Sequence, residues 1–235
     1  KIAFISDIQA DRYTDGKRLV RYIDKINEAN PDLVLIAGDV ITSSPDYIET
    51  AAKYIGKIKS THGTFSCVGD HDNWAYRQDY VRSLREITEA LNQYNVEMPD
   101  NELRYIEKDS SRIGIAFITN TYVSDISETT LQNVTSSNKA EFKIFLTHQP
   151  QEFLINSALD NKYDLFLAGH THGGQITLVF PFVQLTPTLI ETRYIKGDFY
   201  FNDMLAIVCG GLGMSLAPVR YNSTPEIVII TLRNI

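Results

Sequence analysis

The chain has 235 residues and a formal net charge of -7, and its composition of 43% hydrophobic and 22% charged residues is typical of a globular protein. The acidic balance and the lack of a Lys/Arg cluster argue against a nucleic-acid-binding protein, because such proteins neutralise many phosphates. No apolar stretch is long enough to span a bilayer, and we interpret residues 1–235 as a single domain.

The first part of the chain alternates short apolar runs with amphipathic helices. Residues 2–6 predict a strand. Residues 17–30 predict a helix, because apolar side chains recur at the i, i+3, i+4 and i+7 spacing of one helix face. A second helix is expected to begin with Ser44 as the N-cap and Pro45 as the first helical residue. A third helix is predicted over residues 77–94.

Runs rich in β-branched and aromatic residues predict the strands. In the middle of the chain they cover residues 33–37, 64–68, 113–118, 142–147 and 165–168. In the last part they cover residues 176–180, 204–209 and 226–232, with little helix between them. This order predicts an α/β fold in which two sheets pack face to face and helices lie outside.

The two cysteines fall inside these apolar runs. Cys67 lies in the run over residues 64–68, and Cys209 ends the run over residues 204–209. Free cysteine behaves as a small hydrophobic residue and is commonly buried. We therefore expect two packed thiols rather than a disulfide.

Five of the predicted strands end at residues that suit a metal ion. In chain order these ends read Asp7-Ile8-Gln9, Gly38-Asp39, Gly69-Asp70-His71-Asp72, His148, and Gly169-His170-Thr171-His172-Gly173-Gly174. Four of the five histidines of the chain lie at these positions. In α/β folds, ligands bind where strands end, because loops converge there on a rigid scaffold.

Each of these residues also has an ordinary structural interpretation. A lone Asp after a strand commonly forms a turn or a helix cap, a lone His can be a satisfied core residue, and glycines suit turns. Coincidence at five strand ends is a poor explanation, however. His170 and His172 are separated by one residue, so that both side chains point to the same face of an extended segment. Converging aspartates would repel one another without cations, so the combination predicts a metal site.

In their order and spacing, these motifs resemble those of the calcineurin-like metallophosphoesterases. The resemblance extends from Phe4 to nearly the end of the chain. Residues 169–175, which read Gly-His-Thr-His-Gly-Gly-Gln, and the ending over residues 211–226 are similar to a bacterial branch associated with the cell envelope. The resemblance implies a four-layer α/β/β/α sandwich of two mixed sheets with flanking helices. It also implies a membrane or envelope location, and we expect this chain to be the soluble domain of a longer protein.

Carried over residue by residue, the resemblance implies two adjacent divalent cations. The ligands of the first would be Asp7, Gln9, Asp39 and His172, and those of the second would be Asp39, Asp70, His148 and His170. Asp39 would bridge the two. His71 would lie beside the cations and protonate the leaving oxygen, and Asp72 would orient His71. A water held by both cations would attack phosphorus in line.

Two positions depart from the family pattern. Gln9 stands where the family usually has His, and Asp70 stands where it usually has Asn. A neutral amide oxygen is a weaker and harder ligand than imidazole, so we expect the first cation to be held more loosely. This favours Mn, with Fe, Mg and Zn as the other candidates. The added charge of Asp70 strengthens cation binding at the second site.

Three further features are candidates for substrate contact. Arg220 suits bidentate binding of a phosphate, although a structural ion pair is the alternative. Asn73 follows the His71 loop and is a candidate for the pocket rim. The apolar run over residues 176–190 predicts either a lip for a lipid-like substrate or membrane surface, or a strand of the core. Its apolar residues include Val179, Phe180, Phe182, Val183, Leu185 and Leu189.

The sequence thus supports a metal-dependent phosphoesterase, with a lipid-linked or nucleotide-linked envelope phosphoester or pyrophosphate as the substrate class and peripheral membrane contact as a partner surface. The alternative is a metal-binding family member whose catalysis is weak or lost because Gln9 replaces a histidine. Retention of His71 favours the enzyme. A nuclease is disfavoured by the acidic balance. The oligomeric state is left open.

Overall fold

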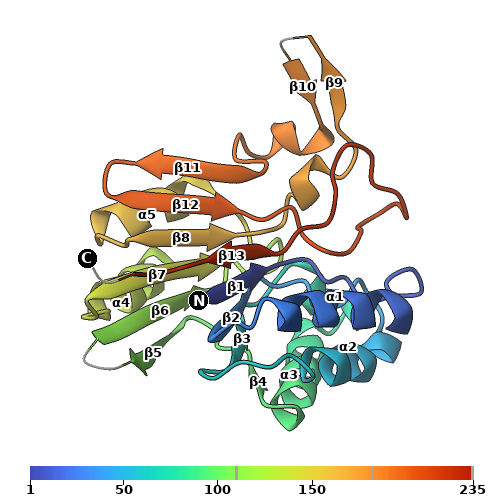
Figure 1. The fold of residues 1–235 in the computed structure, drawn as a ribbon, viewed down its shortest axis with the longest axis horizontal. Coiled ribbons are helices and arrows are strands. Elements are labelled where there is room, and N and C mark those ends of the chain that lie inside the picture. Colours follow the sequence, from blue (N-terminus) through green and yellow to red (C-terminus); the bar gives the residue numbers. More distant parts are fainter. Residues whose placement is uncertain (109–110, 182, 234–235) are drawn as a thin grey trace.

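The computed structural model describes residues 1–108, 111–181 and 183–233. Two β-sheets pack face to face, and helices cover the outer face of each sheet (Figure 1). This is the predicted α/β/β/α sandwich of two mixed sheets. Within the described ranges, no helix combines the length and the apolar character needed to cross a bilayer.

The first sheet has the order β13-β1-β2-β3-β4. Its strands are β1 (Ile2–Ile5), β2 (Leu33–Ile36), β3 (Thr64–Ser66), β4 (Val96–Glu97) and β13 (Val228–Ile230). The first four strands are parallel, and β13 is antiparallel to β1. The helices on its outer face are α1 (Gly16–Glu28), α2 (Ile48–Ile55) and α3 (Tyr80–Gln93).

The second sheet has the order β11-β12-β8-β7-β6-β5. Its strands are β5 (Glu102–Lys108), β6 (Ser111–Ile118), β7 (Phe142–Thr147), β8 (Leu165–Ala168), β11 (Gly197–Phe201) and β12 (Met204–Val208). The four inner strands are parallel, and β5 and β11 are antiparallel edge strands. The helices on its outer face are α4 (Glu128–Ser137) and α5 (Glu152–Asp160).

Alternation along the strands divides the apolar residues between layers. In β1, Phe4 faces the second sheet whereas Ile5 packs with α1 and α3. In β6, Phe117 faces the first sheet whereas Ile118 packs with α4 and α5. Successive side chains of a strand point to opposite faces, so each sheet buries an apolar surface on both sides. The layer between the sheets therefore forms the centre of the molecule.

The three predicted helices are present, with small shifts. The second begins as the 3-10 turn η1 (Pro45–Tyr47), capped by Ser44, and continues as α2. The third begins at Tyr80 rather than at residue 77, because the Asp79 carboxylate accepts a hydrogen bond from the backbone N–H of Arg82 at 3.0 Å and caps α3 there. Helices α4 and α5 are additional to the prediction; α4 has too few apolar residues for a periodic signal.

The predicted strand over residues 176–180 does not belong to either large sheet. Part of this run forms β9 (Leu178–Phe180), which pairs with β10 (Val183–Leu185) in a two-stranded sheet. This hairpin projects away from the body of the molecule (Figure 1). The interpretation of the segment as a core strand is therefore wrong. Phe182, which belongs to the same apolar run, lies outside the described residues.

Candidate metal centre

The predicted ligands meet at one end of the two sheets. Asp7, Asp39 and Asp70 follow β1, β2 and β3 of the first sheet. His148 and His170 follow β7 and β8 of the second sheet. The parallel strands of both sheets thus end at a common place, and the loops that carry these side chains face one another across the gap between the sheets.

The ligand-forming side chains make two groups in which the relevant atoms lie within 4.8 Å of one another. One group is Asp7, Asp39 and His172, and the other is Asp70, His148 and His170. The groups adjoin, because Nε2 of His148 lies 3.4 Å from Oδ2 of Asp39 and 3.3 Å from Oδ2 of Asp70. Asp39 therefore faces both groups, as a bridging carboxylate must.

Five of the seven predicted ligands have a left-handed backbone conformation. Their φ angles are 49° at Asp7, 51° at Gln9, 56° at Asp39, 71° at His170 and 52° at His172. Each such residue costs about 1–2 kcal/mol when it carries a Cβ. Strain of this kind persists where the surrounding structure enforces it, and it gathers at functional sites. These strained turns direct the side chains inward.

Two glycines allow the loops after β2 and β3 to touch. A Cβ on Gly69 would overlap the backbone nitrogen of Asp39, and a Cβ on Gly38 would lie 2.6 Å from the Cα of Gly69. Gly38 also has a φ of 76°, which favours glycine. This close approach of two backbones brings Asp39 and Asp70 together.

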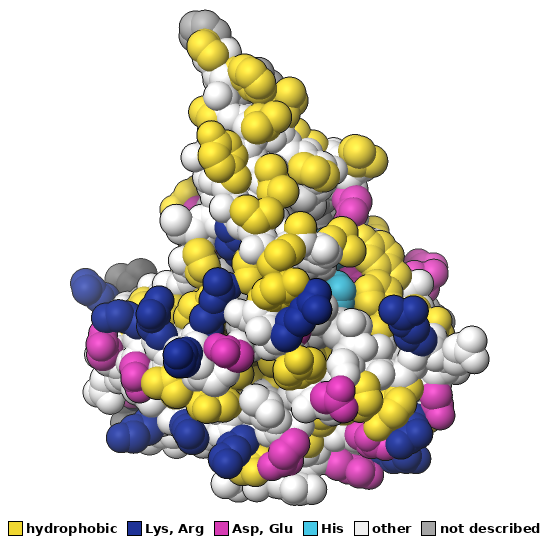
Figure 2. Space-filling view, turned by 90° about the vertical axis from the view of Figure 1, so that its right-hand side faces the viewer, with side chains coloured by type: hydrophobic (Ala, Val, Ile, Leu, Met, Phe, Trp, Pro, Cys, Tyr) yellow, Lys and Arg dark blue, Asp and Glu magenta, His cyan; other side chains and the backbone are white. Residues whose placement is uncertain are grey.

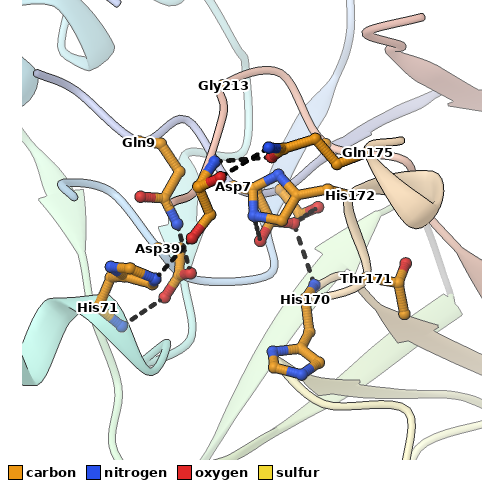
Figure 3. A network of polar contacts seen from close by, with 12 residues as sticks. Asp7, Gln9, Asp39, His71, His170, Thr171, His172, Gln175 and Gly213 are labelled. Carbon is orange, nitrogen blue, oxygen red and sulfur yellow. Dashed lines mark hydrogen bonds and ion pairs between the residues drawn. The ribbon is translucent and has the colours of Figure 1, made fainter. Parts of the chain in front are cut away.

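In and beside the first group, three buried polar atoms form no hydrogen bond with any residue that the structure describes. These atoms are Oδ1 of Asp7, Oε1 of Gln9 and Nε2 of His172. Figure 3 shows the His172 ring beside Asp7 and the Gln9 side-chain amide beside Asp39. Nε2 of Gln9 donates to Oδ2 of Asp39 at 2.7 Å. Buried polar atoms are nearly always paired, and Nε2 of His172 and Oδ1 of Asp7 lie 3.4 Å apart without a hydrogen bond, so they form a donor pair that fits a cation.

The charges in the first group support the same interpretation. Burial raises the pKa of Asp39 to about 7, with the neighbouring charge of Asp7 adding to the effect and His148 opposing it. Burial, helped by the charge of Arg220, lowers the pKa of His172 to about 4. A neutral imidazole is the form that binds metal, and carboxylates crowded in a buried site require positive charge nearby.

His148 is held in the tautomer that a ligand needs. Its Nδ1–H donates to the backbone carbonyl of Ala37 at 2.6 Å, which leaves the lone pair on Nε2 directed at Asp39 and Asp70. Burial opposes a charge on His148, but the two carboxylates outweigh burial and raise its pKa. A proton and a metal ion therefore compete for the same nitrogen.

His170 is oriented by a residue that the sequence did not reveal. Nε2 of His170 lies 2.8 Å from Oε2 of Glu191, which also accepts a hydrogen bond from the Tyr122 hydroxyl at 2.7 Å. Nδ1 of His170 lies 3.0 Å from Oδ2 of Asp70. A carboxylate on the far nitrogen fixes the ring orientation of a metal-binding histidine. No motif connects Glu191 with His170, and only the fold brings them together.

Asp70 has two further partners. The Gln149 side chain donates to both carboxylate oxygens at 2.9 Å, and the backbone N–H of Tyr122 donates at 2.8 Å. Burial opposes ionisation, but hydrogen bonds and charges from His148 and His170 outweigh it and lower the pKa of Asp70. The position of Gln149 directly after His148 was the available sequence signal for this role.

His71 lies beside the groups without joining either. Its Nδ1–H donates to the carbonyl of Thr42, and its Nε2 lies 3.1 Å from the hydroxyl of Ser215. The backbone N–H of His71 donates to Oδ1 of Asp39 at 2.8 Å. The ring lines a pocket of about 340 Å³ over the two groups and also an adjoining cleft of about 680 Å³.

Asp72 does not orient His71, which corrects the role expected for it. Its buried carboxylate accepts hydrogen bonds from the backbone N–H groups of Gly69 at 2.8 Å, Asp39 at 3.0 Å and Val40 at 2.8 Å. The 3-10 turn η2 (His71–Trp74) directs it away from the ring and toward these loops. Asp72 therefore holds the two ligand-bearing loops together, while Thr42 orients the His71 ring.

Arg220 and Asn73 are not placed to bind a substrate. The Arg220 guanidinium donates to the carbonyls of Gly213, Gly210 and His172 at 2.8, 2.7 and 3.0 Å. Its donors therefore tie backbone segments together instead of facing the pocket. Asn73 is buried, and its amide donates to the carbonyls of Gly69 and Asp70 at 3.0 and 3.3 Å. Both expectations of substrate contact are corrected: the two side chains stabilise turns.

Two adjoining sets of cation ligands, open to a pocket beside an imidazole, belong to the chemistry of metal-dependent hydrolases. The bond that is cut follows from comparison with known families: residues 1–174 match the model described as calcineurin-like phosphoesterase. The chain belongs to the calcineurin-like phosphoesterase family.

Individual relatives agree with the family assignment. The chain is 28% identical over 238 residues to an uncharacterized metallophosphoesterase of Campylobacter jejuni, covering 99% of this chain but only 59% of that protein. It is 24% identical over 233 residues to the phosphodiesterase YaeI of Escherichia coli, covering 99% of this chain and 82% of that protein. The crystal structure of TT1561 of Thermus thermophilus superposes with a TM-score of 0.58 at 12% identity, covering 90% of this chain and 89% of that one, which supports the fold.

Proposed function

We propose that the protein hydrolyses a phosphoester at two adjacent divalent cations. The ligands would be Asp7, Gln9, Asp39 and His172 for one cation, and Asp39, Asp70, His148 and His170 for the other. The observation that carries this proposal is the adjoining pair of buried ligand groups, with Asp39 facing both. Cations bound there would supply an activated water and would stabilise negative charge on the phosphoryl group.

His71 is the proposed proton donor to the leaving oxygen. Because Nδ1–H donates to the Thr42 carbonyl, Nε2, which faces the Ser215 hydroxyl, is the nitrogen that would carry the transferred proton. The hydrogen bond from the His71 backbone to Asp39 keeps the ring at the edge of the metal pocket. A proton donor must lie within hydrogen-bond reach of the atom that it protonates. The His71 ring lies where the metal pocket meets the cleft, so it can reach the leaving oxygen of a substrate whose leaving group occupies the cleft.

The cleft favours a substrate with a large leaving group, hence a phosphodiester or pyrophosphate over a small monoester. It is continuous with the metal pocket along His71 and Trp74. Two exposed arginines, Arg12 and Arg77, line it, and neither forms an ion pair with any residue that the structure describes. We propose that they bind an anionic part of the leaving group. A nucleotide-linked or lipid-linked phosphoester has this chemistry.

The two cations are expected to differ in affinity. The first site offers the neutral Gln9 oxygen in place of an imidazole, and Arg220 lies 3.3 Å from Nδ1 of His172. This positive charge disfavours a cation at the same ring. The second site has no such neighbour in the described part of the chain and gains the charge of Asp70. We propose that the second cation is retained on purification, that the first exchanges, and that Mn suits the pair best.

The ligands also support one domain over residues 1–235. Asp7 and Asp39 come from loops of the first sheet, and His148 and His172 come from loops of the second. Neither half of the sandwich holds a complete site alone.

The proposal is tested by metal analysis together with a panel of phosphoester substrates under Mn, Mg, Fe and Zn. The panel contains bis-p-nitrophenyl phosphate, a nucleotide pyrophosphate and a lipid pyrophosphate. The expected result is diester or pyrophosphate hydrolysis that needs added metal. His71→Ala should keep the metal content and lose most turnover. Bound metal without hydrolysis of any substrate would favour the alternative of a family member that only binds metal.

A further inference from the structure

The hairpin of β9 and β10 exposes apolar side chains that a water-soluble surface normally avoids. Leu178, Val179, Phe180 and Leu185 have exposed fractions of 47%, 58%, 49% and 49%. Figure 2 shows the projecting part of the molecule covered with hydrophobic side chains, whereas the body below it is mixed. Large continuous apolar surfaces of this kind mark interaction sites.

β9 exposes apolar side chains on both of its faces, while the register partner of Val179 on β10 is the polar Gln184. Leu178 and Phe180 point to one face of β9, and Val179 between them points to the other, because strand residues alternate. A flat partner surface that packs on the face with Leu178 and Phe180 would leave the exposed Val179 in water. A medium that surrounds the hairpin, such as the acyl region of a lipid bilayer, covers the exposed apolar side chains on both faces of β9 at once.

The charge pattern fits this surrounding. No Asp, Glu, Lys or Arg occurs between His172 and Glu191, so the whole hairpin and its connections are uncharged. Lys and Arg side chains lie in a band across the body at the foot of the hairpin (Figure 2). An apolar tip above a band of cations complements the acyl chains and the anionic headgroups of a bilayer.

The hairpin is continuous with the metal pocket. It follows closely after η3 (His172–Gly174), and the segments at its base, including Ile176, Pro187 and Thr188, line the pocket over the metal groups. The exposed Leu216 lines both this pocket and the cleft beside it. Whatever holds the hairpin therefore also sets the position of the pocket mouth.

We propose that the β9–β10 hairpin inserts into a lipid bilayer and holds the pocket at the level of the headgroups. This deepens the proposed function, on which it rests for the substrate: the phosphoester is then one carried by a membrane lipid, presented to the cations from the bilayer surface. Insertion itself does not depend on catalysis and is measured without it.

The test uses the full chain and lipid vesicles in a flotation assay. The vesicles are either pure phosphatidylcholine or an equimolar mixture with phosphatidylglycerol. We expect binding to both, tighter to the anionic vesicles and weakened by salt. Val179→Glu and Leu185→Glu place a charge in the acyl region, and each should reduce partitioning about tenfold or more, which corresponds to ~1.4 kcal/mol. Both side chains are already exposed, so the folded body is not disturbed.

Val81→Glu is the matched control. Val81 is 79% exposed on α3, a helix that lies far from β9 and β10 in Figure 1. This variant should bind vesicles like the natural chain. All three variants should hydrolyse a water-soluble diester at the natural rate, whereas the two hairpin variants should lose activity on a substrate embedded in vesicles.

Three outcomes would overturn the proposal. One is that the natural chain binds neither type of vesicle. Another is that the hairpin variants and the control bind equally well. The third is that Val179→Glu converts a dimer to a monomer and leaves vesicle binding unchanged, which would assign the hairpin to a second copy of the chain. If the soluble diester is still hydrolysed in these cases, hairpin insertion is refuted but the proposed function is not. If hydrolysis is absent while vesicle binding is intact, the proposed function is refuted but hairpin insertion is not.

Discussion

Replacement of Asp72 by Ala separates a structural role from a catalytic one. The buried carboxylate satisfies three backbone N–H groups, from Gly69, Asp39 and Val40. Without it, three buried donors lose their acceptor at a cost of ~1–3 kcal/mol each, partly relieved by water that enters the space. We therefore expect Asp72→Ala to lower the free energy of unfolding by roughly 3–5 kcal/mol, and to loosen the loops that hold the ligands.

The assay is urea unfolding followed by circular dichroism, with Asp79→Ala as the control. Asp79 is an exposed helix cap whose carboxylate accepts one backbone N–H, from Arg82, so the same substitution should cost only ~1 kcal/mol there. If Asp72→Ala lost turnover while its unfolding free energy changed by less than that of Asp79→Ala, the bracing role would be refuted. Direct assistance to His71 would then explain the effect.

Three further predictions concern the metal site, the cleft and the thiols. Gln9→His should supply an imidazole to the first site and raise the manganese retained after dialysis from about one to about two equivalents. Plasma mass spectrometry measures this content, and an unchanged value would show that Gln9 does not limit manganese binding at that site. Arg77→Ala should raise KM for a diester with an anionic leaving group by roughly two- to fivefold, as expected for the loss of one exposed charge pair. It should leave kcat unchanged, and it should leave KM unchanged for a diester with a neutral leaving group. An equal rise in KM for both diesters would contradict a contact between Arg77 and the anionic group. Burial raises the pKa of the Cys209 thiol to about 12 and that of Cys67 well above its usual range, so the neutral thiol dominates in the folded protein and neither should react with Ellman's reagent at pH 8 until guanidinium is added. Rapid labelling of the folded chain would contradict that burial.

The sandwich and the main ligands could be predicted because their signals are local. Short apolar runs that stop at Asp, Gly or His mark strand ends, and the fold brings the ends of parallel strands together. Asp7, Asp39 and His172 were found in this way and form one group. The left-handed backbone at these residues is a consequence of the same tight turns.

The contacts that the sequence did not reveal depend on the packing of distant segments. Glu191 reaches His170 only because the chain after the hairpin folds back beside the metal pocket. The role expected for Asp72 was wrong because its position next to His71 in the sequence suggested a contact between their side chains. The 3-10 turn that contains both residues instead directs the Asp72 carboxylate to the neighbouring loops. Arg220 was expected to bind substrate because no sequence pattern reveals that its guanidinium donates to backbone carbonyls.

The hairpin shows a different limit. An apolar run predicts burial, but not whether protein or lipid surrounds it. Its separation from both large sheets, and the exposure of Val179 and Phe180 on opposite faces, are visible only in three dimensions. That lipid surrounds the apolar hairpin therefore remains a proposal, whereas the position of the hairpin next to the metal pocket is given by the fold.

Anomalous diffraction at the manganese edge, from crystals grown with manganese, would locate the two proposed cations. Two peaks are expected on either side of the Asp39 carboxylate, one beside Asp7 and His172 and a stronger one beside Asp70 and His148. A lone peak remote from Asp39, or no peak at these side chains at saturating manganese, would contradict the proposed pair of cations.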